Sequence, residues 1–201
     1  MDESPADTPA VTDGAPESAA PAGSGSVPGA TASGGRPALA VALALIAGCV
    51  VAGDQFTKYL AVRDLAENVP VTVVAGWLQL RLIRNPGAAF SLATGSTWIF
   101  TIIATVVSLV IVRVSRQLGS RWWAVALGLL LGGAVGNLID RLTRAPGFGR
   151  GHVIDFIEYL RFPFIDFPVF NVADSCITTA AVLIALLGLR GIAVDGSRTA
   201  G

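Results

Sequence analysis

The sequence predicts an all-α membrane protein with four transmembrane helices and a small extracytoplasmic β-hairpin or sheet element. Three observations lead to this fold class. Hydrophobic residues make up 53% of the 201 residues, charged residues only 14%, and the mean hydropathy is +0.65, whereas soluble domains carry about 25% charged residues. Four apolar runs approach the length that crosses a bilayer, and the loop after the first run alternates apolar and polar residues. The net charge of zero gives no basic field that would attract nucleic acid.

The first 36 residues differ in composition from the rest of the chain. They are rich in Ala, Pro, Gly, Ser and Thr and contain hardly any large apolar side chains. Such a segment buries too little surface to offset its ordering entropy, so we expect 1–36 to be a disordered cytoplasmic tail. It lacks the basic start of a secretory signal, so the apolar run after it is expected to remain as the first span. The membrane domain then covers 37–194, and 195–201 form a short cytoplasmic tail.

Each apolar run predicts a helix that crosses the membrane. The runs lie at about 37–62, 97–114, 121–142 and 171–190, and a spanning helix needs about 20 predominantly apolar residues. Arg113, Arg116 and Arg121 surround the short link between the second and third runs, which contains no acid. Because short basic loops favour the cytoplasm, both termini are expected there, and the two longer loops face outward.

The first outer loop predicts a β-hairpin. Valines at every second position of 69–73 and leucines at every second position of 78–82 are typical of strands with one apolar face. Ala75 and Gly76 are expected to form the turn. The second outer loop contains FPFIDFPVF at 162–170, whose aromatic residues suit the membrane interface.

Polar residues near the span ends are candidates for function, because such residues are costly inside a membrane. Asp54 and Lys58 share one helix face and can pair, either as a structural ion pair or as the floor of a site. Asn137, Asp140 and Arg141 also project from one face, either to anchor a helix end or to join the same site. Glycines at 128, 132 and 136 form a ladder that permits close helix packing.

Asp155 and Asp174 suggest a reaction. Asp174 and Asn171 stand at the start of the fourth span, where an acid can simply cap the helix. A short aromatic loop joins the two aspartates and can bring their carboxylates together. Two close carboxylates in a poorly hydrated place share one proton, so one can activate water while the other donates to a scissile carbonyl.

This chemistry is that of aspartic peptidases, and it requires no metal and no cofactor. His152 is the only histidine, which argues against a Ser/His/Asp triad, a rhomboid-like serine peptidase and a histidine-rich metal site. Cys49 and Cys176 lie in separate apolar runs and are expected to be packing residues.

Five sequence blocks, in order along the chain, resemble the lipoprotein signal peptidases (signal peptidase II). They are DQFTK at 54–58, NPGAAFS at 85–91, GNLIDR at 136–141, VIDF at 153–156 and FNVAD at 170–174. The tail before residue 37 lies outside this resemblance. The Gly/Pro-rich segment 142–154 is long for the family, so its path to Asp155 stays open.

The resemblance implies a multi-pass enzyme of the bacterial inner membrane with its active site near the outer face. It implies cleavage of prolipoproteins just before a cysteine that already carries diacylglycerol. The family's catalytic residues correspond to Asp155 and Asp174. Its supporting residues correspond to Asp54, Lys58, Asn85, Asn137, Asp140, Arg141 and Asn171.

Two other functions compete with this one. A small proton-coupled carrier would use the acids as a relay, but it predicts internal repeats or broken helices in matching halves, and the sequence shows neither. A non-catalytic membrane scaffold would use the polar residues only to fasten its helices. Exchanging either aspartate for asparagine would then alter stability without an enzymatic effect.

Overall fold

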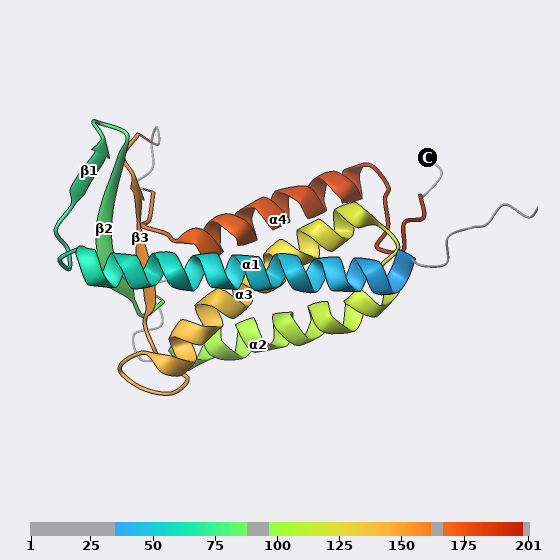
Figure 1. Ribbon diagram of the computed structural model, residues 1–201, viewed down its shortest axis with the longest axis horizontal. Helices are drawn as coiled ribbons and strands as arrows, with labels where there is room; N and C mark the ends of the chain where they lie inside the picture. Colours follow the sequence, from blue (N-terminus) through green and yellow to red (C-terminus); the bar gives the residue numbers. More distant parts are fainter. Residues whose placement is uncertain (1–34, 88–96, 162–166, 199–201) are drawn as a thin grey trace, which may run out of the picture. The chain divides into compact units, whose positions relative to one another are not determined.

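The computed structural model describes residues 35–87, 97–161 and 167–198 (Figure 1). The expected disordered tail, apart from its last two residues, lies outside the described residues and stays a prediction. The same holds for parts of the two outer loops, 88–96 and 162–166.

Within these described residues, four helices are long and apolar enough to cross a membrane, as the sequence predicts. They are α1 (Gly35–Asp64), α2 (Thr97–Val114), α3 (Arg121–Thr143) and α4 (Val172–Leu189), and a single 3-10 turn, η2 (Ser115–Gln117), joins α2 to α3. With 30 residues, α1 is about 45 Å long, whereas the hydrocarbon core of a bilayer is about 30 Å thick. The helix is thus longer than the core is thick, and its last turns reach the sheet (Figure 1).

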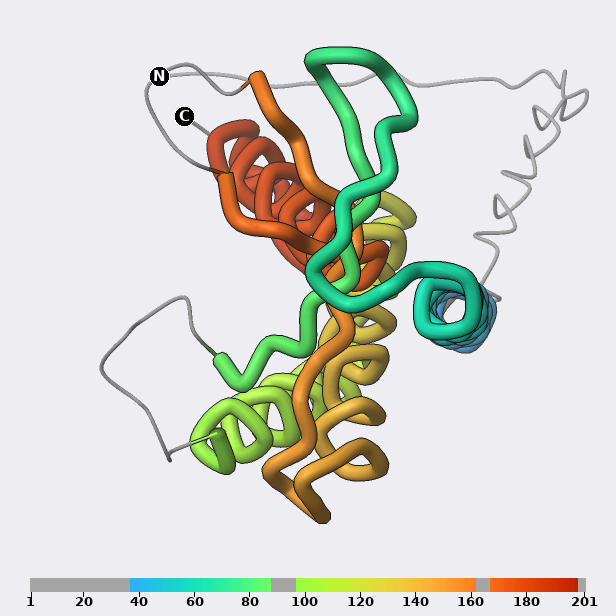
Figure 2. The backbone as a smooth tube through the Cα atoms, turned by 90° about the vertical axis from the view of Figure 1, so that its left-hand side faces the viewer, coloured from blue at the N-terminus to red at the C-terminus, as the bar shows by residue number. Residues whose placement is uncertain are grey.

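α3 lies between the other three helices (Figure 2). The glycine ladder explains how closely they approach. A Cβ on Gly132 would lie 2.6 Å from Cβ of Val50 in α1, and one on Gly128 would lie 2.9 Å from Cβ of Ile46 in the same helix. Gly133, which is outside the ladder, allows α4 to approach, because a Cβ there would lie 2.6 Å from the carbonyl oxygen of Ala173. These contacts confirm the predicted role of small residues in helix packing.

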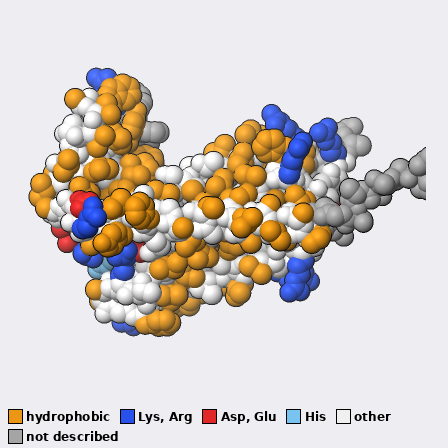
Figure 3. All heavy atoms as spheres, in the orientation of Figure 1, with side chains coloured by type: hydrophobic (Ala, Val, Ile, Leu, Met, Phe, Trp, Pro, Cys, Tyr) orange, Lys and Arg blue, Asp and Glu red, His pale blue; other side chains and the backbone are white. Residues whose placement is uncertain are grey.

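Most apolar side chains of α1, α2 and α4 point outward. Examples are Leu45, Leu109 and Val182, which are 65%, 64% and 54% exposed. A water-soluble monomer rarely presents so continuous an apolar surface, which is visible along the helices in Figure 3. Lys and Arg side chains gather at the two ends of the helices, as expected at the boundaries of a bilayer.

The predicted hairpin is present and has a third strand. β1 (Val71–Val74) and β2 (Leu78–Asn85) are antiparallel around a turn at 75–77. β3 (Val153–Tyr159) pairs with β2 on its other side, in the order β1-β2-β3. This third strand was not predicted from the sequence. Its register places Asp155 opposite Ile83 and Asn85 opposite Val153, which brings two blocks of the sequence together.

The segment after α3 doubles back on the end of that helix. The amide of Gly151 donates to the carbonyl of Arg141 (3.0 Å), and the amide of His152 donates to that of Ala145 (2.9 Å). A Cβ on Gly151 would lie 2.9 Å from the carbonyl oxygen of Arg144 and closer still to that of Asp140. The chain from α3 to Asp155 therefore folds back against the end of α3.

We expect Gly151→Ala to displace the start of β3 and to lower the free energy of unfolding by about 1–3 kcal/mol, as overpacking does. Gly48→Ala is the matched control, because nothing lies within 4 Å of a Cβ added at Gly48. Thermal unfolding of both variants in one detergent measures the difference. Equal midpoints would show that the loop tolerates a side chain at 151.

Candidate active site

The candidate site lies where the end of α1, the end of α3, β3 and the start of α4 meet. Asp155, on β3, is 2% exposed, and Asn171, which precedes α4, is fully buried. Asp174 is the third residue of α4 and is half-buried. We call Asp155 and Asp174 the aspartate pair.

Asp174 caps its own helix, as the simpler interpretation proposed. Asn171 and Asp174 form a capping box. The Asn171 side chain accepts from the amide of Asp174 (2.9 Å), and Asp174 Oδ2 accepts from the amide of Asn171 (3.2 Å). The other carboxylate oxygen, Oδ1, accepts from Nδ2 of Asn137 at 2.8 Å. The cap therefore orients this carboxylate, and it does not exclude a chemical role.

Asn171 also binds the second aspartate. Its Nδ2 donates to Asp155 Oδ1 at 2.7 Å, while Nδ2 of Asn85 donates to Asp155 Oδ2 at 2.8 Å. One asparagine thus holds both members of the aspartate pair, one through its side chain and the other through its capping box. The two carboxylates are fixed relative to each other by hydrogen bonds to both oxygens of each.

Burial alters the acidity of Asp155. Loss of hydration raises the pKa of this carboxyl to about 6, against the hydrogen bond from Asn85, while the charge of nearby Asp174 raises it further. A carboxyl with this pKa is still about one-tenth protonated at pH 7, so Asp155 can carry the proton that a pair of carboxylates shares.

Lys58 lies behind the aspartate pair and is fully buried. Its ammonium contacts Asp54 Oδ2 (2.8 Å), Asp140 Oδ2 (2.8 Å) and Asn137 Oδ1 (2.9 Å), which uses all three of its protons. The predicted Asp54–Lys58 pair is thus present. Because Asn137 Oδ1 accepts from Lys58, its Nδ2 is left to donate to Asp174.

The two acids around Lys58 each hold a different element. Asp54 Oδ1 accepts from the amide of Ala173 at 2.9 Å, which ties α1 to α4. Asp140 Oδ2 accepts from the amide of Ile154 at 3.2 Å, directly before Asp155. A Cβ on Gly136 would lie 2.7 Å from Asp54 Oδ2, so the glycine makes room for this carboxylate.

Two further residues belong to the network and were not predicted from the sequence. Arg144 Nε donates to Asp140 Oδ1 at 2.6 Å, and Gln55 Nε2 donates to the carbonyl of Gly136 at 3.0 Å. The four-residue spacing of Asp140 and Arg144 on one helix could have indicated the first contact. Gln55 lies within the block DQFTK at 54–58, which could have indicated the second contact.

Arg141 stands apart from the Lys58 network, although the sequence placed it on one face with Asn137 and Asp140. Its guanidinium lies over the ring of Phe100 in α2, 5.1 Å from the ring centre. Its Nη1 is buried and has no hydrogen-bond partner among the described residues. A buried donor without a partner is costly, so this nitrogen is available for a ligand.

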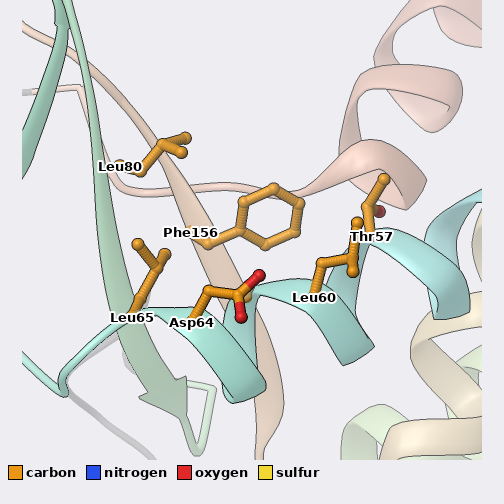
Figure 4. A pocket seen from close by; sticks show the side chains of 7 residues that line it. Thr57, Leu60, Asp64, Leu65, Leu80 and Phe156 are labelled. Atoms are coloured by element: carbon orange, nitrogen blue, oxygen red, sulfur yellow. The ribbon is translucent and has the colours of Figure 1, made fainter.

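A separate pocket of about 210 Å³ lies between α1 and the sheet (Figure 4). Phe156 points into it together with Leu60 and Leu80. Neighbouring residues of a strand point to opposite faces, so Asp155 faces away from this pocket. Its lining contains one carboxylate, Asp64, and the aspartate pair is elsewhere.

Comparisons with known proteins agree on one family. A family model described as signal peptidase (SPase) II matches residues 46–190. Proteins named lipoprotein signal peptidase are similar to most of the chain. That of Rhodococcus jostii (strain RHA1) is 51% identical, covering 78% of this chain and 76% of the relative. That of Mycobacterium avium (strain 104) is 46% identical, covering 83% and 90%.

Solved structures are similar as well. A bacterial membrane enzyme determined by the in meso method at 1.9 Å resolution is 36% identical, with a TM-score of 0.64 over 73% of this chain and 91% of that one. Another, at 2.3 Å resolution, is 32% identical, with a TM-score of 0.65 over 78% and 93%. The predicted fold class is confirmed.

We expect Lys58→Met to lower the free energy of unfolding by about 3–5 kcal/mol, because it leaves the buried Asp54 without its counter-ion and Asp140 with Arg144 alone. Arg63→Met is the matched control, since Arg63 forms an exposed pair with Asp64 and should change little. Thermal unfolding in one detergent compares them. A Lys58→Met protein as stable as the control would contradict the role given to the ammonium.

The raised pKa of Asp155 predicts a pH dependence. Its folded pKa lies above the unfolded value, so its stabilising contribution is complete below about pH 4 and is lost as the pH rises through about 6. The wild type should lose on the order of 3 kcal/mol over this range. Asp155→Asn should lack this component, whereas the exposed Glu67→Gln should keep it. Parallel pH profiles of unfolding for wild type and Asp155→Asn would refute the assignment.

Proposed function

The chain belongs to the signal peptidase II family, and from this premise we propose that Asp155 and Asp174 are its catalytic pair. The family is one of aspartic peptidases, so the chain is a multi-pass endopeptidase of the bacterial membrane that removes signal peptides from prolipoproteins. The observation that supports this assignment of residues is the binding of both carboxylates by Asn171. The carrier and scaffold alternatives lose their basis, because the family is one of enzymes.

The reaction that we propose uses one water molecule. One carboxylate takes a proton from the water molecule while the water oxygen attacks the scissile carbonyl carbon. The other, protonated, gives its proton to the carbonyl oxygen. The raised pKa of Asp155 allows this carboxyl to carry the proton. Collapse of the tetrahedral intermediate breaks the C–N bond, and the amine leaves with a proton from the pair.

Three asparagines and Arg141 would hold the substrate and the carboxylates. Asn85, Asn137 and Asn171 donate to the aspartate pair, which fixes the carboxylates before substrate binds. Arg141 has a buried Nη1 without a partner among the described residues. We assign it to a carbonyl oxygen of the substrate backbone. Asp54, Lys58 and Asp140 act behind these residues by positioning them.

The substrate that we propose carries diacylglycerol on the cysteine that follows the scissile bond. Its acyl chains would stay in the bilayer and set the depth of that bond. The active site would lie near the outer face, with both termini in the cytoplasm. Supporting this, Arg113, Arg116 and Arg121 surround the link at the end of the helices opposite the sheet. Residues 37–194 would form the peptidase domain between two short cytoplasmic tails.

We expect Asp155→Asn and Asp174→Asn each to reduce cleavage by at least about 10²–10⁴-fold, the contribution typical of a general acid or base. The assay measures cleavage of a purified diacylglyceryl-prolipoprotein by the full chain in nanodiscs. Glu67→Gln, which removes an exposed acid outside the site, is the control. Full activity of either aspartate variant, folded as judged by thermal unfolding, would exclude that residue from the pair.

A further inference from the structure

A hollow of about 430 Å³ lies at the opposite end of the helices from the aspartate pair. Its walls come from the first turn of α3, the last turns of α4 and the segment after α4. Trp122, Leu183 and Leu186 give it an apolar wall, and Arg190 and Arg198 stand at the same hollow. The combination of an apolar wall with two cations is not used by the proposed reaction.

The segment after α4 is folded back so that Arg198 reaches this place. Trp123 Nε1 donates to the carbonyl of Ile192 at 2.9 Å, and the amide of Gly119 donates to that of Val194 at 3.0 Å. Ile192 and Arg198 then form an antiparallel bridge. The position of Arg198 beside the end of α4 is therefore part of the fold.

The two arginines lack a counter-charge in the part of the chain that the structure describes. Neither Arg190 nor Arg198 forms an ion pair with a described carboxylate. The nearest acid along the chain, Asp195, accepts hydrogen bonds from the amide and hydroxyl of Ser197. Both guanidiniums are exposed and can bind an anion.

The apolar wall continues into the membrane-facing surface of α4. Leu186 is 43% exposed, Val182, one turn deeper, is 54% exposed, and Trp122 is 56% exposed. Arg190 follows α4 directly, so the cations stand where the span ends. An acyl chain entering the hollow would thus leave its headgroup phosphate at the arginines.

We propose that this hollow binds an anionic phospholipid, with its phosphate between Arg190 and Arg198 and one acyl chain along Trp122, Leu183 and Leu186. Guanidinium groups bind phosphate oxygens through two parallel hydrogen bonds. Each arginine near a bilayer surface strengthens binding of an anionic lipid roughly fivefold. The occupant is a lipid and not a soluble phosphate, because the wall between the helices is apolar.

Native mass spectrometry of the full chain in detergent, titrated with dioleoylphosphatidylglycerol, tests this proposal. We expect the Arg190→Gln/Arg198→Gln protein to bind roughly 25-fold more weakly than the wild type. Arg113→Gln/Arg116→Gln is the matched control: it removes the same charge at the same end of the helices from residues that do not line the hollow. This control should bind like the wild type.

Two further probes identify the ligand. Dioleoylphosphatidylcholine should bind more weakly than the anionic lipid, and glycerophosphoglycerol, the headgroup without chains, should not bind. If both double variants bind the anionic lipid equally weakly, surface charge alone attracts the lipid, and the proposed site is wrong. Equal binding of the headgroup would mean a soluble phosphate site. If the Arg190→Gln/Arg198→Gln protein unfolds at a lower temperature than the wild type, the lipid affinity of the single variant Arg198→Gln is compared with that of the control instead.

Discussion

The buried ammonium of Lys58 holds together the elements on which the site depends. It joins Asp54 of α1 to Asp140 of α3, and these acids in turn bind the first turn of α4 and the backbone before Asp155. A buried ion pair often adds little stability compared with apolar packing, because desolvating the charges is costly. What it provides here is orientation, because one ammonium fixes the positions of three acceptors on α1 and α3. The positions of Asn137 and Asp174 follow from that arrangement.

Much of the fold could be predicted because it depends on local patterns. The four spans follow from runs of apolar residues, and the hairpin follows from a period of two in the first loop. The third strand could not be predicted in this way. Val153, Ile154, Asp155 and Phe156 are all buried, so β3 does not alternate between apolar and polar residues. Its pairing with β2 also joins segments about 70 residues apart, and no local pattern reports such a contact.

The sequence predicted which residues belong to the site better than it predicted the hydrogen bonds between them. The order of the sequence blocks indicated which polar residues belong together, and the structure brings Asn85, Asn171 and both aspartates into one network. The contact of Arg141 with Phe100 of α2 could not be predicted from spacing, because a shared helix face does not determine the direction of a long side chain. Likewise, the capping role of Asp174 and its place in the pair are compatible, since each uses a different oxygen.

The spacing of Asp54 and Lys58 also bears on how the protein is assembled. Their partners lie far along the chain: Asn137 is 79 residues beyond Lys58, and Ala173 is 119 residues beyond Asp54. During synthesis α1 therefore reaches the translocon before any of these partners exists. Because the two charges sit one turn apart on the same helix, they neutralise each other within α1 and ease its entry into the lipid. The ion pair that later organises the site thus first lowers the cost of inserting its own helix into the membrane.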